Sequence, residues 1–211
     1  NLIKISKKNK DKNFVFASSS AIYGDLKNKR LSEDSGPLLP ISTYGAMKLA
    51  SEAIISAAQE SFLKKIYIFR FPNVVGHPST HGVIHDFINR LKKNPINLDV
   101  LGNGNQQKVY MHVNDLIKSM IYVVKNSKKK ISLFNLGPRD DGVKVKFISK
   151  EVVKYFTKNK KITFQKKIKG WVGDVPLFRY STKKFQKFAP KIKTYSKDAI
   201  VRAVKELILK R

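Results

Sequence analysis

The first third of the chain alternates between apolar, strand-like segments and a long helix-like segment. Residues 13–17 (Asn-Phe-Val-Phe-Ala) are typical of a buried strand, residues 43 to about 63 of a helix with one apolar face, and residues 66–71 (Ile-Tyr-Ile-Phe-Arg-Phe) of a second buried strand. This order predicts an α/β fold, and any function of the chain has to be placed on that framework.

The remainder of the chain continues the mixture of helices and strands and indicates a second, smaller lobe. We expect helices at about 82–93, 114–126, 145–157, 182–188 and 196–210, and strands at 132–136 and 162–164. Asn114 and Asp115 stand before the second of these helices as its N-cap, which favours a structural over a catalytic role for Asp115. We find no internal repeat and no low-complexity linker.

Length and composition are those of a folded protein. The 211 residues suffice for one substantial core or for two small lobes, and 42% hydrophobic with 10% aromatic residues are not typical of a disordered chain. The chain has no cysteine, which excludes a disulfide scaffold and thiolate chemistry. Its apolar runs fall short of the ~18 residues that a membrane span requires, so we expect a cytoplasmic protein without a membrane partner.

The charge is strongly unbalanced. Lys and Arg number 43 against 15 Asp and Glu, which gives a formal net charge of +28. The basic residues are spread over the expected loops and helix faces, with the densest runs at 27–30, 92–93, 128–130, 158–161 and 166–167. This spread favours a solvated basic surface over a specific nucleic-acid site, although weak binding of polyanions at low salt follows from the charge alone.

Residues 44–48 (Tyr-Gly-Ala-Met-Lys) place a phenol and an ammonium one turn apart on one face of the expected helix. An ammonium close to a phenol favours the phenolate, the form that accepts a proton. A hydroxyl from the serine run 18–20, Ser19 by position, can hydrogen-bond the same substrate oxygen. Singly, each feature is more often structural, because Tyr and Lys fall four apart by chance and serines after a strand usually form a turn or a cap.

Taken in order, these features resemble a known family. The first strand, Ser-Ser-Ser-Ala-Ile-Tyr-Gly at 18–24, a loop with two prolines and Ser-Thr-Tyr-Gly-Ala-Met-Lys at 42–48 are similar to the extended short-chain dehydrogenase/reductases, the family of nucleotide-sugar epimerases and dehydratases. The resemblance is greatest to the UDP-glucose 4-epimerase-like members. It continues through residues 69–76, 101–115 and 170–176, and so covers essentially the whole chain.

The resemblance implies the C-terminal part of a Rossmann-type, doubly wound parallel sheet together with a small α/β substrate-binding lobe. Family members open with a strand and a Gly-x-x-Gly-x-x-Gly turn that holds the dinucleotide pyrophosphate. This chain has no such run, and residues 2–5 resemble the end of the helix before the serine strand. We therefore expect an N-terminally truncated member, with residues 1–75 from the NAD-binding Rossmann domain and residues 76–211 mainly from the substrate lobe, crossing back around 105–136.

The resemblance also implies site residues, and no metal. The catalytic group would be Ser19, Tyr44 and Lys48, and the residues beside the cofactor NAD would be Tyr44, Lys48, Phe71 and Pro72. The substrate, a nucleotide sugar such as a UDP-hexose, would contact Ser19, Asn73, Val100, Leu101, Lys108 and Asp174. Lys108 and Trp171 stand where many members carry arginines, and a lysine supplies the charge without the bidentate fork. Without the resemblance, Asn73 would be interpreted as a loop cap.

The residues after Ser19 distinguish reactions within the family. The 4,6-dehydratases carry an Asp-Glu pair there, because eliminating water needs an added acid and base. Here these positions are Ser20 and Ala21, and the glutamate that decarboxylating relatives carry at the second position is also absent. An epimerase or a simple reductase remains, with the epimerase favoured. The resemblance then implies an NAD-dependent enzyme that inverts C4 of a UDP-hexose by transient oxidation to a ketone. Members are often homodimers through a bundle that includes the catalytic helix, so we expect a homodimer.

Two alternatives remain open. One is another reductase or dehydratase of the same family. The other is a non-catalytic basic fragment that binds polyanions or a partner chain, which the missing glycine-rich turn and the charge of +28 favour. Intact Ser19, Tyr44 and Lys48 oppose this second alternative. By themselves the 211 residues are expected to be inactive, because most contacts to a dinucleotide would be absent.

Overall fold

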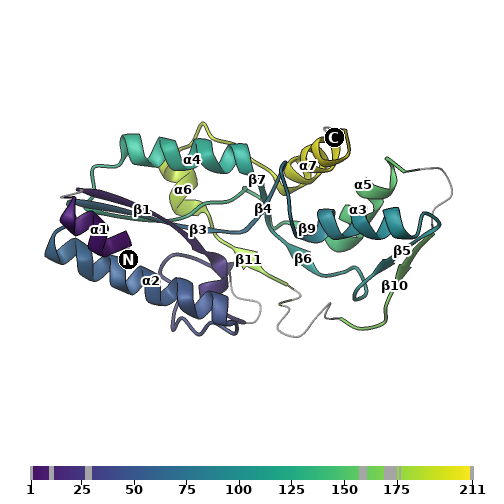
Figure 1. Cartoon of the computed structure of the whole chain (residues 1–211), viewed down its shortest axis with the longest axis horizontal. Helices are drawn as coiled ribbons and strands as arrows, with labels where there is room; N and C mark the ends of the chain where they lie inside the picture. The colour runs from purple at the N-terminus through teal and green to yellow at the C-terminus, as the bar shows by residue number, and fades with distance from the viewer. Residues whose placement is uncertain are drawn as a thin grey trace. The chain divides into compact units, whose positions relative to one another are not determined.

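The computed structural model describes residues 2–9, 12–26, 30–156, 161–168, 175 and 177–209. The chain forms two compact units and passes between them repeatedly (Figure 1). Unit 1 comprises Asn1–Pro72, Ile117–Leu136 and Tyr180–Ile192, and unit 2 comprises Asn73–Leu116, Gly137–Arg179 and Lys193–Arg211. Each unit has an apolar core of its own.

Unit 1 is built on a parallel sheet of three strands. β1 (Asn13–Ser19) pairs with β3 (Lys65–Phe71), and β3 pairs with β8 (Ile131–Asn135), so β3 is the central strand. Because both faces of β3 are covered, its residues 66–70 are all buried, and all of them except Arg70 are apolar or aromatic. The register places Ser19 beside Phe71, so these two strands end at the same edge. The predicted α/β fold with a parallel sheet is confirmed.

Helices cover both faces of this sheet (Figure 1). On one face lie α1 (Leu2–Lys8) and α2 (Thr43–Ser61), and Phe16 of β1 packs there with the buried Ile55 of α2. On the other lie the part of α4 (Val113–Asn126) that belongs to unit 1 and α6 (Lys183–Phe188), which contact Tyr67 and Phe134 of the sheet. Successive strand residues point to opposite faces, so one apolar strand serves both layers.

Short elements complete unit 1. The 3-10 helix η1 (Ser20–Tyr23) follows β1 directly, and β2 (Arg30–Leu31) forms a two-stranded pair with β11 (Arg179–Tyr180). The backbone N–H of Ser181 donates to the carbonyl oxygen of Leu31 at 2.8 Å, which joins the late segment 180–192 to the early part of the chain.

Unit 2 also combines helices and strands, and it is not smaller than unit 1. Its core is formed by α3 (Val83–Lys93), α5 (Val145–Val153) and α7 (Ser196–Leu209). Strand pairs border this core: β4 (Asn73–Val75) with β7 (Tyr110–His112) and β5 (Asn97–Val100) with β10 (Lys161–Phe164), both parallel, and β6 (Gln107–Lys108) with β9 (Val143–Lys144), antiparallel. None of the helices described is long and apolar enough to cross a membrane.

One prediction about the helix ends is wrong. Asn114 and Asp115 do not precede α4, because the helix already begins at Val113. The N–H of Asn114 donates to Nδ1 of the buried His112 at 3.2 Å. The acceptor at the start of the helix is therefore the imidazole of His112, and not the side chain of Asn114 or Asp115 that we predicted. Asp115 instead lies in the first turn, where its carboxylate is 3.8 Å from Arg202.

Candidate active site

The carboxyl ends of the strands in unit 1 carry the first predicted catalytic residue. Ser19 ends β1 and is in register with Phe71, the last residue of β3. Ligands of open α/β sheets bind outside this edge of the sheet. The other two predicted catalytic residues, Tyr44 and Lys48, lie on α2.

Two predicted residues lie at the beginning of α2. The side chain of Ser42 accepts the N–H of Gly45 at 3.1 Å and caps the helix, so Tyr44 belongs to the first turn. Lys48 follows one turn later on the same face, with its Nζ 5.7 Å from the centroid of the Tyr44 ring. Tyr44 is 55% exposed, so the residue is accessible from solvent.

Gly45 packs this first turn against the backbone that follows β1. It is buried, and a Cβ at this position would lie 2.6 Å from the carbonyl oxygen of Ala21 and 3.0 Å from the Cβ of Pro40. Only a residue without a Cβ allows so close an approach. Because Ala21 is two residues after Ser19, this contact brings the turn that carries Tyr44 to the end of β1.

Lys48 is bound directly to β1. Its Nζ donates to the carbonyl oxygen of Ala17 at 2.7 Å and lies 5.0 Å from the centroid of the Phe16 ring. An ammonium has three N–H donors, and this bond uses one of them. The side chain thus presents a fixed positive charge with further donors at the end of the strand.

Ser19 has a structural role that leaves its hydroxyl proton for donation. Its Oγ accepts the N–H of Ala21 at 3.1 Å and caps η1, as expected for a serine after a strand. A hydroxyl that accepts one hydrogen bond keeps its own proton for donation. The cap therefore leaves Ser19 able to donate to an oxygen of a ligand.

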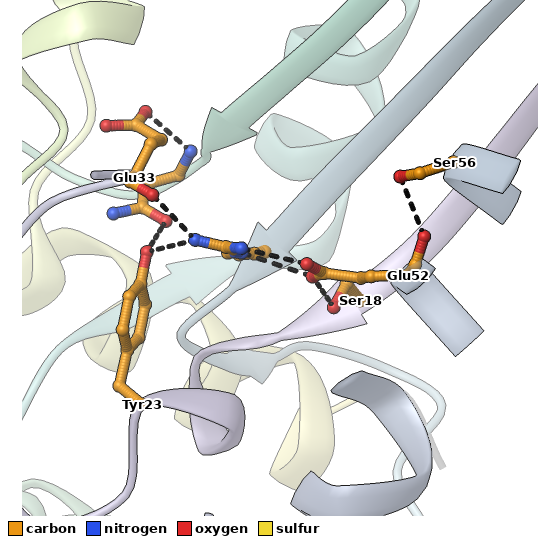
Figure 2. A network of polar contacts seen from close by, with 7 residues as sticks. Ser18, Tyr23, Glu33, Glu52 and Ser56 are labelled. Carbon is orange, nitrogen blue, oxygen red and sulfur yellow. Dashed lines mark hydrogen bonds and ion pairs between the residues drawn. The ribbon is translucent and has the colours of Figure 1, made fainter. Parts of the chain in front are cut away.

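A buried polar network, which we did not predict, adjoins these residues (Figure 2). Glu52 lies one turn after Lys48 on α2 and forms an ion pair with Arg70 of β3, with 2.8 Å between Oε2 and Nη2. Burial opposes the charge of Arg70, but its hydrogen bonds with Glu52 and Tyr23 outweigh burial and raise its pKa. The sequence did carry a signal, because an arginine inside an apolar strand needs a buried partner.

The network continues to the ends of β3 and β8. Nη1 of Arg70 donates to the hydroxyl of Tyr23 at 2.9 Å, and that hydroxyl donates to Oδ1 of Asn135 at 2.8 Å. The N–H of Asn135 donates to Oε1 of Glu33 at 2.8 Å. Burial raises the pKa of Tyr23, and it raises the pKa of the fully buried Tyr180 further. The hydroxyl of Tyr180 donates to the carbonyl oxygen of Arg70. Both phenols therefore stay protonated and serve the framework as donors.

Asn73, a predicted substrate residue, opens β4 in unit 2. Its Nδ2 and its backbone N–H both donate to the carbonyl oxygen of Val109, at 3.1 and 3.2 Å. The side chain thus fixes the start of the strand, which is a structural role like the cap that we would infer without the resemblance. The second N–H of the amide is not needed for that role.

The other predicted substrate residues of unit 2 differ in exposure. Val100 ends β5 and is 1% exposed, whereas Leu101 after it is 39% exposed. Lys108 is half-buried in β6. Asp174 and Trp171 lie outside the described residues. Of the predicted site residues, Ser19, Tyr44, Lys48, Phe71 and Pro72 thus belong to unit 1, and Asn73, Val100, Leu101 and Lys108 belong to unit 2.

Comparison with known proteins gives a family match. Residues 1–137 match the profile of the NAD dependent epimerase/dehydratase family. A UDP-glucose 4-epimerase of Lactobacillus helveticus is 33% identical over 144 residues, which cover 60% of this chain and 43% of that protein. The chain spans less than half the length of this curated relative.

Solved structures agree with the sequence match. A crystal structure of UDP-galactose 4-epimerase superposes with a TM-score of 0.84 at 29% identity, covering 98% of this chain and 66% of that one. The UDP-glucuronic acid 4-epimerase of Bacillus cereus, solved with UDP-glucuronic acid and NAD, shares the fold, with a TM-score of 0.80 at 22% identity over 98% of this chain and 64% of that one. The predicted Rossmann-type fold is confirmed.

Proposed function

This chain belongs to the NAD-dependent epimerase/dehydratase family, and we propose that the protein containing it is a nucleotide-sugar epimerase. The proposed reaction inverts a hydroxyl, at C4 of a UDP-hexose, by transient oxidation to a ketone. One observation carries the proposal: Tyr44 and Lys48 stand one turn apart on α2, and Gly45 packs their helix against the backbone after Ser19. The relatives named as UDP-glucose and UDP-galactose 4-epimerases support this choice of substrate.

Tyr44 is the proposed base. Its phenolate oxygen takes the proton of the sugar hydroxyl, and the ammonium of Lys48, anchored on Ala17, balances the negative charge of that phenolate. The hydroxyl of Ser19 donates a hydrogen bond to the same sugar oxygen and holds that oxygen in place. After the ketone has presented its other face, Tyr44 returns the proton and the base is restored.

The residues at the strand ends of unit 1 suit a nicotinamide nucleotide. After its bond to Ala17, Lys48 retains two N–H groups for ribose hydroxyls. The half-buried Phe71 and the buried Pro72 offer an apolar border for a ring. When bound, NAD would supply the hydride acceptor and donor that the reaction requires. Unit 1 is thus our proposal for the NAD-binding part, with Tyr44, Lys48, Phe71 and Pro72 beside the cofactor.

Unit 2 is our proposal for the part that holds the nucleotide sugar. Lys108 gives a positive charge for the diphosphate, without the two-pronged geometry of an arginine. The spare N–H of the Asn73 amide is suited to a phosphate oxygen. The backbone at Val100 and Leu101 would contact the base, and Asp174 would contact a ribose hydroxyl.

A dehydratase is the second candidate, because the family includes enzymes of that kind. Elimination of water needs an additional acid and base near the reacting carbon. The side chains that directly follow Ser19 are a serine and an alanine, which supply neither group at neutral pH. This difference favours epimerisation.

The test is an assay of the full-length protein with NAD and a panel of UDP-hexoses, followed by proton NMR of the sugar. Appearance of the C4 epimer supports the proposal. A product that has lost water would replace it with the dehydratase, and an unchanged sugar across the panel would contradict both.

A further inference from the structure

The ion pair between Glu52 and Arg70 adjoins the proposed site but touches no residue proposed to bind substrate. Glu52 is 6% exposed and Arg70 is 4% exposed. The guanidinium donates from Nε to Oε1 at 3.1 Å and from Nη2 to Oε2 at 2.8 Å, and the hydroxyl of Ser18 donates to Oε1 as well (Figure 2). The carboxylate thus joins α2 to both β3 and β1.

Both donors of Nη1 of Arg70 are occupied too. Its Nη1 donates to the hydroxyl of Tyr23 at 2.9 Å and to the carbonyl oxygen of Glu33 at 3.1 Å. Hydrogen bonds on three sides hold the guanidinium in one orientation. The carboxylate that binds it through both oxygens is then held in a fixed orientation as well. Buried pairs of this kind add little net stability relative to apolar residues of the same volume. Their physical effect is therefore to be sought in geometry.

The geometry relates the pair to the proposed catalytic residues. Tyr44, Lys48 and Glu52 follow one another at intervals of four along one face of α2. Lys48 binds the carbonyl oxygen of Ala17, and Glu52 binds the hydroxyl of Ser18, so successive turns of the helix contact successive residues of β1. Ser18, which binds Glu52, directly precedes Ser19, and the Tyr44 end of the helix meets the backbone after Ser19 through the contact of Gly45 with Ala21. A rotation of α2 at Glu52 is carried along a rigid helix to Tyr44, about 12 Å away.

We propose that Glu52, Arg70 and Ser18 are positioning residues that set the orientation of α2 and thereby align Tyr44 and Lys48 with Ser19. The expected effect on catalysis rests on the proposed function. The alignment itself is a property of the fold and has a readout that does not require turnover.

The test uses the full-length protein with Glu52→Gln, which keeps the shape of the side chain and removes the charge that opposes Arg70. We expect kcat to fall by about tenfold to a hundredfold, as for a small misplacement of reacting groups. We expect KM to stay within about threefold, because these residues touch no substrate. Amide hydrogen exchange of a peptide covering 44–51 should become faster.

Ile55→Val is the matched control, since Ile55 is 3% exposed on the same helix but packs in the apolar cluster. This variant lowers stability and should leave kcat and the exchange of 44–51 as in the wild type. Arg70→Lys tests geometry against charge, because a lysine keeps the charge and loses the fork. It should lower kcat like Glu52→Gln. If Glu52→Gln does not fold, Ser18→Ala, which leaves the ion pair intact, should still accelerate exchange.

The inference would be overturned if Arg70→Lys and Ser18→Ala had the same kcat and the same exchange rate of 44–51 as the control Ile55→Val. It would also be overturned if the loss of kcat in every variant, the control included, were proportional to its loss of stability. A wild-type protein that converts no UDP-hexose would contradict the proposed function alone. The exchange of 44–51 would then still decide whether the network orients α2.

Discussion

A single missing methyl group determines how α2 approaches the end of β1. We expect Gly45→Ala to lower the free energy of unfolding by about 1–3 kcal/mol, the usual cost of overpacking. The added Cβ would lie 2.6 Å from the carbonyl oxygen of Ala21. We expect the free-energy cost of this overlap to exceed the gain of about 1 kcal/mol that alanine brings in helix propensity. Denaturant unfolding measures the difference.

The matched control for this prediction is Gly36→Ala. A Cβ at Gly36 would meet nothing within 4 Å, so this variant should change stability little. A Gly45→Ala protein as stable as the wild type would show that the first turn of α2 does not rest on Ala21.

In unit 2, one carboxylate links stability to pH. Glu206 accepts hydrogen bonds from Nε2 of His112 at 2.9 Å and from Nε of Arg202 at 3.1 Å. Burial opposes its ionisation, but these bonds outweigh burial and lower the pKa of Glu206. A carboxylate whose pKa is lower in the folded state stabilises the fold above its unfolded pKa of about 4.3, and the stabilisation is lost as the pH falls through the folded pKa.

Glu206→Gln should therefore weaken the decline of the unfolding free energy below about pH 4.3. Urea unfolding across a series of acidic buffers measures the slope, with the exposed Glu60→Gln as control. Identical slopes for wild type and Glu206→Gln would contradict the role of these hydrogen bonds.

At the level of residues, the catalytic predictions concerned exposed or half-buried groups and omitted the buried network. Tyr44 and Lys48 were selected because their spacing has a chemical use, and Ser19 because it follows a strand. The pair of Glu52 and Arg70 was missed, because an arginine in an apolar strand indicates that it needs a buried partner but not which residue the fold supplies. Eighteen positions of sequence separate them, and no local pattern pairs them.

At the level of elements, periodicity predicted most of the long helices and the strands of the parallel sheet. The strands of unit 2 were harder, because several have only two or three residues and depend on their partners for order. The error at the start of α4 has a similar cause. The acceptor at that position comes from His112, a residue type that is not a usual cap.

The surface of α1 and α2 suggests the mode of self-association. Leu2 and Ile5 of α1 are 68% and 51% exposed, and Met47 and Ile54 of α2 are 67% and 58% exposed, on the two helices that cover one face of the sheet. We expect the full-length protein to form a homodimer through these helices, because burial of such side chains stabilises association.

Analytical ultracentrifugation of Met47→Glu/Ile54→Glu tests this expectation. The double variant should sediment as a monomer at concentrations where the wild type is a dimer. Ile96→Glu, at a 74% exposed position of unit 2, should remain dimeric. A dimeric double variant would place the interface elsewhere.

At the level of the molecule, the charge of +28 predicts binding to polyanions that weakens as salt rises. In unit 1, lysines gather where the strands begin, at the edge opposite Ser19: Lys12, Lys64, Lys65, Lys128, Lys129 and Lys130. In unit 2, Lys144, Lys146 and Lys150 are exposed on and beside α5. If the charge acts only as a solvated basic surface, the two groups of lysines should contribute equally to polyanion binding.

Elution from heparin distinguishes a general basic surface from a specific face. Replacing residues 128–130 by glutamine should lower the eluting salt concentration as much as replacing 144, 146 and 150. A large decrease with only one of the two triple variants would identify a specific polyanion site and favour the non-catalytic alternative.

The division of the chain into units was the least accessible feature to sequence reasoning. Residues 180–192 return to unit 1 after a long passage through unit 2, and we did not anticipate this return. It is held by contacts far apart in sequence, such as the hydroxyl of Tyr180 on the carbonyl oxygen of Arg70. Composition and periodicity contain no information on such pairings.

The most direct test of the proposed epimerase is Tyr44→Phe in the full-length protein, which removes one oxygen atom. With NAD and the UDP-hexose that the wild type converts, the rate of epimerisation should fall by about a hundredfold or more, the usual contribution of a general base. Tyr195→Phe, at an exposed position of unit 2, is the control and should retain the wild-type rate. Undiminished epimerisation by Tyr44→Phe would contradict the assignment of Tyr44 as the base and the mechanism built on it.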